Sequence, residues 1–219
     1  MSTTNPYSER VFWFSHTVAR TVLDHLLIGE VEGLNNVPRH GACILAVNHA
    51  SHFDPPLIGC LVMREITFFA RKTLWINKAA SWWLDSVGTI PVDRDGDSDI
   101  KAMRATLGTL KNGGLLSLFP EGTRSKDGAL QSAKPGIGLI AAKSQATVIP
   151  CRIFNSHRVL SKGKVLPNFN LRVHMRYGKP LSPEDYDPGK EAGKQRFQVV
   201  ADRIMAEIAK LDRPRAKAL

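Results

Sequence analysis

The stretch LAVNHASHFDPP, residues 45–56, changes from apolar to polar at its centre. The apolar run Cys43–Val47 has the length of a buried strand, and His49 and Asp54 follow just beyond its end. A histidine held by a carboxylate keeps one tautomer and can take a proton from a hydroxyl group, which contributes about 10²–10⁴ in rate. The pair predicts a general base at His49, although this spacing also arises by chance beside a helix-capping aspartate.

Two further polar clusters follow apolar runs in the same way. In GTIPVDRD, residues 88–95, the run Thr89–Val92 leads to Arg94. In LLSLFPEGTRS, the run Leu115–Phe119 leads to Glu121, Gly122, Thr123 and Arg124. Because the carboxyl ends of parallel strands share one edge of an open sheet, where such folds bind ligands, the three clusters predict one active site.

The residue types in these clusters indicate anion binding. Arg94 and Arg124 can each pair with a phosphate through two charge-assisted hydrogen bonds, whereas either arginine alone is more typical of a surface ion pair. Gly122 permits close approach of the backbone, and Thr123 adds a hydroxyl group. Glu121 either accepts a hydrogen bond from a substrate hydroxyl or fixes Arg124.

Two more polar residues lie within the first cluster. Ser51 is interpreted as a hydroxyl that braces the loop, and His52 as a bystander rather than a second base. The protein supplies no serine nucleophile in this interpretation.

The rest of the chain alternates between strand and helix patterns. Further strands are expected at 66–70, 147–154 and 171–177, and helices at 56–63, 79–86, 98–111, 136–143 and 191–210. This alternation predicts an α/β fold: a mixed, largely parallel central sheet flanked by helices.

The N-terminal segment Pro6–Ile28 has the periodicity of an amphipathic helix. His16 falls on its polar side, and so does Trp13, which is unusual for a helix that packs only on its own core. The chain is therefore divided into an N-terminal helix region, residues 1–29, and a main domain, residues 30–219.

Composition limits the class of protein. The 219 residues, with 43% hydrophobic and 23% charged residues, are typical of one globular domain, and no apolar stretch approaches the length of a membrane span. Three cysteines in apolar surroundings are expected to be buried, reduced thiols in a cytosolic setting. The formal net charge of +10 favours an acidic partner: anionic lipid, a phosphorylated substrate, an acidic carrier protein or nucleic acid.

With these motifs, the chain resembles the 1-acylglycerol-3-phosphate acyltransferases, the glycerolipid acyltransferase family that converts lysophosphatidic acid into phosphatidic acid. The matching segments are NHASHFD, VGTIPVDR, FPEGTRS and VIPCRI, together with AKPGIGLIA, which contains Lys134. The resemblance runs from about Leu27 to Tyr177.

The resemblance implies roles for these residues. His49, backed by Asp54, would deprotonate a glycerol hydroxyl that attacks the thioester of acyl-CoA or acyl carrier protein. Arg94 and Arg124, with Lys134, would hold the phosphate of the acceptor. The residues Glu121, Gly122 and Thr123 would help to seat the glycerol. The family needs no metal and no bound cofactor.

A lipid acceptor implies docking on a membrane. The expected location is the cytoplasmic face of the cell membrane, as a peripheral protein without a transmembrane span. Phe12 and Trp13 of the first helix, and Trp75 and Trp82 of the segment TLWINKAASWWLDS, are the predicted docking residues, beside basic residues suited to anionic lipid. One of Trp82 and Trp83 is expected in the core.

Other functions are compatible with the same motifs. A different acceptor, such as glycerol 3-phosphate, a lyso-ornithine lipid or a glycolipid, would use the same catalytic pair. A peripheral lipid-binding protein without catalysis would not need His49. Nucleic-acid binding is not expected, because the chain lacks basic residues interleaved with aromatic ones and lacks a recognition helix.

Overall fold

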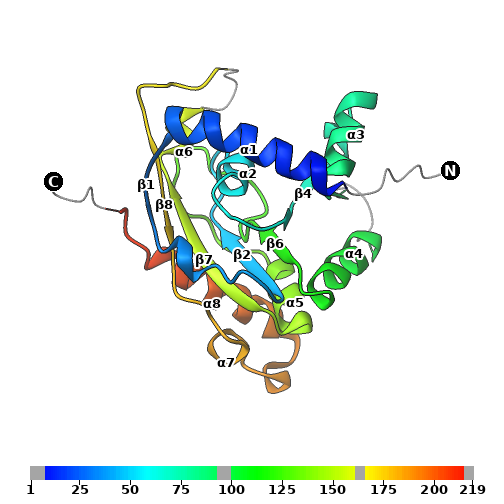
Figure 1. Ribbon diagram of the computed structural model, residues 1–219. Coiled ribbons are helices and arrows are strands. Elements are labelled where there is room, and N and C mark those ends of the chain that lie inside the picture. The colour runs from blue at the N-terminus through cyan, green and yellow to red at the C-terminus, as the bar shows by residue number, and fades with distance from the viewer. Residues whose placement is uncertain (1–7, 93–99, 161–165, 215–219) are drawn as a thin grey trace.

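The computed structural model describes residues 8–92, 100–160 and 166–214. A six-stranded sheet lies at its centre, in the order β1-β8-β7-β2-β6-β3 (Figure 1). Strands β7 (Thr147–Phe154), β2 (Cys43–Val47), β6 (Leu115–Leu118) and β3 (Ile66–Thr67) run parallel to one another. Strand β8 (Val173–Tyr177) is antiparallel to β7 and parallel to the edge strand β1 (Ile28–Glu32). The predicted mixed, largely parallel sheet is confirmed.

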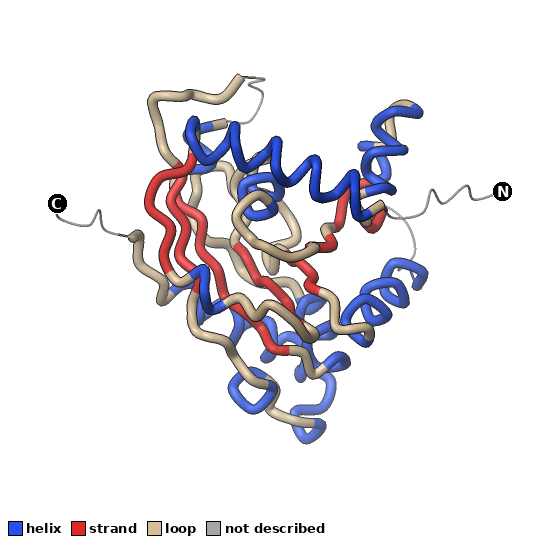
Figure 2. The backbone as a smooth tube through the Cα atoms, in the orientation of Figure 1, coloured by secondary structure: helices blue, strands red, loops and turns tan. Residues whose placement is uncertain are grey.

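The central strand β2 is buried on both faces. Successive side chains of a strand point to opposite faces, so Cys43, Leu45 and Val47 enter one core and Ile44 and Ala46 the other. The continuous apolar run therefore does not alternate with polar residues. The first core is closed by α1 (Glu9–Leu26) and α2 (Asp54–Gly59), which cross the same face of the sheet (Figure 2).

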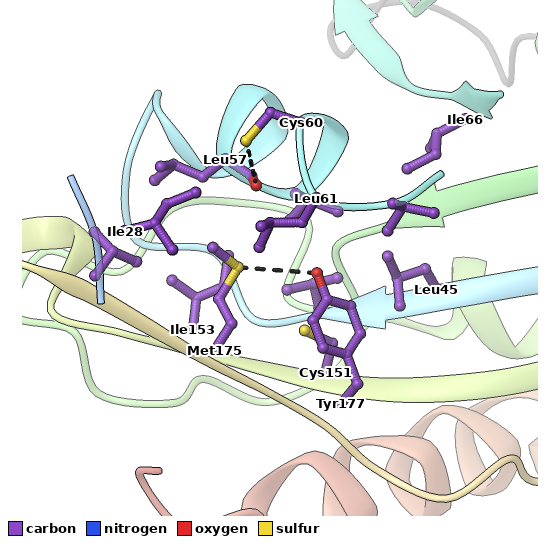
Figure 3. Packing of buried hydrophobic residues seen from close by; sticks show 14 of the residues in the cluster. Ile28, Leu45, Leu57, Cys60, Leu61, Ile66, Cys151, Ile153, Met175 and Tyr177 are labelled. Carbon is purple, nitrogen blue, oxygen red and sulfur yellow. Dashed lines mark hydrogen bonds between the residues drawn. The ribbon is translucent and has the colours of Figure 1, made fainter. Parts of the chain in front are cut away.

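Figure 3 shows the packing of this first core beneath α2. Its buried side chains include Leu57 of α2, Met175 and Tyr177 of β8, and all three cysteines, of which Figure 3 labels Cys60 and Cys151. All three cysteines are buried and free, as the sequence predicted.

The second core lies under three helices. These are α4 (Ile100–Lys111), α5 (Pro135–Ser144) and α8 (Arg196–Ala209). The final helix was predicted as one element, but α8 is preceded by a 3₁₀ segment, η3 (Lys190–Gln195), with a non-helical backbone at Gly193. The short helices α6 (Ser156–Val159) and α7 (Pro183–Tyr186) and the 3₁₀ turn η1 (Leu34–Asn36) lie in the connections.

One predicted strand belongs to a different sheet. The segment expected as a single strand at 66–70 divides at Phe68 into β3 and β4 (Phe69–Arg71), and β4 leaves the main sheet to pair in parallel with β5 (Ile90–Val92). The strand expected at Thr89–Val92 is therefore not part of the six-stranded sheet, because among the described residues β5 pairs with the three residues of β4. A 3₁₀ turn, η2 (Lys72–Leu74), and α3 (Lys78–Ser86) connect β4 to β5.

Helix α1 begins and ends within the predicted segment, but its buried side differs from the prediction. Phe12 and His16 are its buried residues, and the His16 ring nitrogen Nε2 lies 3.2 Å from the carbonyl oxygen of Val62. The placement of His16 on the solvent side is wrong. The prediction that Phe12 docks on a membrane is contradicted too, because its side chain is 8% exposed. Among the helices in the described part of the chain, none is both long and apolar enough for a membrane span.

Candidate active site

The predicted base lies at the carboxyl end of β2, between β7 and β6. The side chain of Asn48 continues the pairing of β2 with β7: its Nδ2 donates to the Ile153 carbonyl at 3.1 Å, and its Oδ1 accepts from the Ile153 N–H at 2.7 Å. Asn48 is 3% exposed, so these bonds satisfy a buried amide at the point where the strand ends. The backbone that leads into His49 is thereby anchored.

His49 and Asp54 form the expected pair. His49 Nδ1 lies 2.8 Å from Asp54 Oδ2, and the carboxylate is fully buried at the start of α2. The same oxygen accepts hydrogen bonds from the N–H groups of Ala50 and Ser51, at 2.7 and 2.8 Å. Because a carboxylate only accepts, Nδ1 carries the proton of the neutral ring, and Nε2 is the acceptor.

Packing fixes the plane of the ring. The His49 ring stacks on the ring of Phe119, the first residue after β6, with centroids 4.0 Å apart and an interplanar angle of 21°. Ser51 braces the loop, as predicted: its hydroxyl donates to the Leu160 carbonyl and accepts from the Phe53 N–H. The imidazole is therefore oriented by one charge and one aromatic face.

Glu121 does not lie where a substrate ligand would. Its side chain is 1% exposed, Oε1 accepts the N–H of His49 at 3.1 Å, and Oε2 accepts the side-chain N–H of Gln131 at 3.1 Å. The prediction that Glu121 binds substrate is contradicted, since both oxygens serve the protein. Burial raises the pKa of this carboxyl to about 7, and the nearby negative charge of Asp54 acts in the same direction.

The backbone of His49 is held at both of its polar groups by the loop after β6. Its N–H donates to Glu121, and its carbonyl oxygen accepts the N–H of Ser125 at 2.8 Å. Sequence patterns did not indicate this clamp, because it depends on residues more than seventy positions away. Gln131 was missed for the same reason.

The rest of the FPEGTRS loop faces outward. Gly122 has a positive φ of 67°, which favours glycine, and an added Cβ there would lie 3.3 Å from Cγ of Lys134. Thr123 and Lys134 are exposed and Arg124 is half-buried. The Lys134 N–H donates to the Pro120 carbonyl at 2.8 Å, so the start of α5 is bound to this loop.

Positive charges gather beside His49. Partial burial lowers the pKa of His52, and the charges of Arg124, His49 and Arg71 lower it further. Sequence patterns did not assign Arg71 to the site, yet Arg71 is the last residue of β4, just as the other polar clusters stand at the ends of their strands. The same rule that identified Arg124 could have identified it.

Arg94 lies outside the described residues. The strand before it is described, and Val92 is the register partner of Arg71. The structure thus brings His49, Asp54, Glu121, Gly122, Arg124 and Lys134 together, and it leaves Arg94 untested.

The predicted docking residues differ in exposure. Trp13 is half-buried against the rings of Phe12 and His16, and Trp75 is half-buried with its indole N–H donating to Asp85. Trp82 is 52% exposed. The expectation that one of Trp82 and Trp83 is in the core is wrong, because Trp83 is 46% exposed, with its indole N–H on Ser15 of α1.

An α/β sheet that presents a buried aspartate, a histidine and a group of cations at one edge defines a class of group-transfer protein, and the comparisons agree. A family model described as Acyltransferase matches residues 29–154. The chain belongs to the acyltransferase family.

Named relatives narrow the resemblance. The chloroplastic 1-acyl-sn-glycerol-3-phosphate acyltransferase of Arabidopsis thaliana is 30% identical over 147 residues, 65% of this chain and 41% of the relative. The 1-acyl-sn-glycerol-3-phosphate acyltransferase of Streptococcus pneumoniae is 28% identical over 77% of this chain and 60% of its own length. The 1-acyl-sn-glycerol-3-phosphate acyltransferase of Bacillus subtilis is 28% identical over 84% of this chain and 89% of its own length. The chain thus spans about two fifths to three fifths of the first two relatives.

A solved structure shows the same fold. The crystal structure of the 1-acyl-sn-glycerophosphate (LPA) acyltransferase PlsC from Thermotoga maritima superposes with a TM-score of 0.69 at 26% identity. The alignment covers 91% of this chain and 80% of that chain. The predicted resemblance to the 1-acylglycerol-3-phosphate acyltransferases is confirmed.

Proposed function

We propose that this protein transfers an acyl group from acyl-CoA or acyl carrier protein to the sn-2 hydroxyl of lysophosphatidic acid and so forms phosphatidic acid. The names of its relatives support the reaction class. The observation that carries the proposal is the His49–Asp54 contact of 2.8 Å at the carboxyl end of β2.

The base in this proposal is His49. With Nδ1–H on Asp54, Nε2 takes the proton of the glycerol hydroxyl while the oxygen attacks the thioester carbonyl. The tetrahedral intermediate collapses, the C–S bond breaks, and the thiolate receives the proton from the imidazolium. Atoms and charge balance without a metal or a covalent enzyme intermediate.

The phosphate of the acceptor is assigned to the cations beside His49. Arg124 lies in the loop after β6, and Lys134 directly precedes α5. Arg71, the last residue of β4, lies close enough to His52 to lower its pKa. Arg94 is the fourth candidate. A phosphate held there keeps the glycerol within reach of Nε2, and such positioning supplies a large share of the rate in reactions of this kind.

Docking on a bilayer is the remaining part of the proposal. Helix α1 presents an exposed apolar line, separate from its buried side, formed by Phe14, Val18, Val22 and Leu26. Neighbouring exposed apolar residues on η2 and α3 are Leu74, Trp82 and Trp83, and α3 is tied to α1 by Trp83 and Ser15. We assign this surface, together with Trp13 and the exposed basic residues Lys72 and Lys78, to the cytoplasmic face of an anionic membrane.

The test is product formation from lysophosphatidic acid with palmitoyl-CoA or palmitoyl carrier protein. We expect His49→Ala to lose at least about 10²-fold in kcat, and Arg124→Ala to raise KM for the acceptor. Matched controls are His40→Ala, an exposed histidine before β2, and Arg104→Ala, an exposed arginine on α4.

Three outcomes separate the alternatives. Thiol release with glycerol 3-phosphate or another acceptor, but not with lysophosphatidic acid, would keep the chemistry and change the substrate. Unchanged turnover in His49→Ala would refute the assigned base. Lipid binding by the wild type without any thioester consumption would leave a non-catalytic lipid-binding protein.

A further inference from the structure

The main chain of His49 is bound to a single loop, the one after β6. That loop contains Gln131, a side chain with no assigned role. Residues 119–134 leave β6 and return so that the Lys134 N–H meets the Pro120 carbonyl. Inside this loop, Glu121 lies between the His49 N–H and the side-chain N–H of Gln131. Gln131 is half-buried and its amide is the outer member of this chain of contacts.

The chemistry of the three groups sets their roles. A carboxylate has only acceptor oxygens, so Glu121 needs one donor for the oxygen that holds His49 and another for the oxygen that faces away from it. At 1% exposure it has little access to water, and a buried oxygen without a donor is costly. Gln131 provides that donor on the side away from His49 through its side-chain N–H.

From this geometry we propose that Gln131 is a positioning residue for acyl transfer, acting through Glu121 on the backbone of His49. The inference rests on the proposed function and deepens it. Glu121 in this view touches neither substrate nor the reacting atoms. Glu121 holds the backbone of His49 in the position from which Nε2 reaches the glycerol hydroxyl.

Ionisation of Glu121 supports the same arrangement. Burial raises the pKa of this carboxyl to about 7, the Asp54 carboxylate raises it too, and the N–H groups of His49 and Gln131 lower it. Loss of the Gln131 side-chain donor must therefore raise the pKa further and weaken Glu121 as an acceptor near neutral pH. The charges of Arg124 and Arg71 act on the pKa of His52.

The kinetic test compares Gln131→Ala with Gln198→Ala. Gln198 is a matched control, because it is also half-buried and its Nε2 donates to the same loop, at the Ala133 carbonyl, without reaching Glu121. We expect Gln131→Ala to lower kcat about 10-fold with less than about a 2-fold change in KM for lysophosphatidic acid, since misplacement of a base affects the chemical step. Its acidic limb in the kcat–pH profile should move to higher pH. Gln198→Ala should change neither kcat nor the pH profile.

Two kinetic results would overturn the inference. One is equal kcat and equal pH profiles for the two variants. The other is a loss confined to KM, which would place Gln131 in acceptor binding. Gln131→Met keeps the length of the side chain without the donor and replaces the alanine variant if that variant melts early.

A second measurement does not depend on turnover. The amide proton of His49, observed by NMR, should titrate with the pKa of Glu121 in the wild type and at higher pH in Gln131→Met. An amide shift that is independent of pH in both proteins would refute the clamp. If the wild type acylates no acceptor, the proposed function fails, while this titration still decides whether Gln131 acts through Glu121 on His49.

Discussion

At the scale of single residues, His49 is constrained separately in its ring and in its backbone. The ring is held by Asp54 and Phe119, and the backbone by Glu121 and Ser125. Phe119, Glu121 and Ser125 all come from the loop after β6, and Asp54 begins α2. A small displacement of any of these groups would move Nε2. Substitutions of the buried polar residues here should therefore affect catalysis more than substitutions of the exposed ones.

Replacing Asp54 by asparagine should weaken His49 as a base. The position of Oδ2 faces three donors, so the neutral amide oxygen takes it, and the negative charge that stabilises the imidazolium is lost. We expect kcat to fall by about 10²–10⁴-fold, measured as phosphatidic acid formed per enzyme. Asp202→Asn, an exposed aspartate on α8, is the control. Equal activity of the two variants would contradict the role of Asp54.

Glu121 should make the stability of the protein depend on pH. Its pKa in the folded state, about 7, lies above the ordinary value of 4.5, so the folded protein binds more protons between these values. The stabilisation is complete below about pH 4.5 and is lost as pH rises through about 7, by about 3 kcal/mol at most.

The check is urea unfolding of wild type and Glu121→Gln between pH 4.5 and 8. The glutamine does not titrate, so the difference in unfolding free energy between the two proteins should change with pH in that window. A difference that is constant across the window would show that Glu121 titrates in the same range when folded and unfolded.

At the scale of elements, the loops of the site depend on how closely the helices under the sheet pack. Helices α5 and α8 touch through Gly138, where an added Cβ would lie 1.8 Å from the carbonyl oxygen of Phe197. Lys134 precedes α5 directly, so the position of this helix also sets the position of that cation. Gly108, inside α4, has no atom within 4 Å of the equivalent point.

These two glycines predict opposite effects of the same substitution. Gly138→Ala should destabilise the protein by about 1–3 kcal/mol, because α5 and α8 must separate. Gly108→Ala should stabilise it by about 0.5–1 kcal/mol, because alanine favours the helix and meets no neighbour. Thermal unfolding of both variants tests this pair. A similar melting temperature for the two would mean that α5 and α8 yield to the methyl group at little cost.

At the scale of the whole molecule, α1 separates the core from the surface assigned to the bilayer. Its inward side carries Phe12 and His16, and its outward side is divided between an apolar line and a polar strip that includes Thr17. The apolar line, formed by exposed side chains, is the part of the helix that we assign to the bilayer.

A charge on that line should weaken binding to anionic vesicles. Val22 is 47% exposed, so burying the rest of its side chain in lipid is worth about 1 kcal/mol. Val22→Asp also adds repulsion, and we expect about a 10-fold lower partition coefficient in vesicle sedimentation. Thr17→Asp adds the same charge on the polar strip and should bind more nearly like wild type. Equal losses in both would indicate a purely electrostatic attraction.

Much of the fold could be predicted from local patterns. The bounds of β2 and β7 agree with the prediction, and β2, which is buried on both faces, shows as an uninterrupted series of apolar residues. The pair His49–Asp54 was equally predictable, since both residues come from one short segment whose strand and helix set their separation.

Other features could not be predicted, for identifiable reasons. Helical periodicity showed apolar residues on α1 but not which of them face the core, so Phe12 and His16 were misplaced. The run at Thr89–Val92 has the pattern of a strand, but nothing local indicates that it pairs with β4 outside the main sheet. Glu121 belongs to a polar motif, and only packing shows that its carboxylate turns inward.

The sequence by itself determined the family, the α/β alternation and the residues that carry the proposed chemistry, because residue types and their spacing along one segment are local properties. Only the tertiary structure decided that Glu121 and Gln131 hold His49, that Arg71 joins the cations, and which side of α1 meets solvent. Those facts depend on which distant segments pack together, and burial of a polar group is set by all of its neighbours at once.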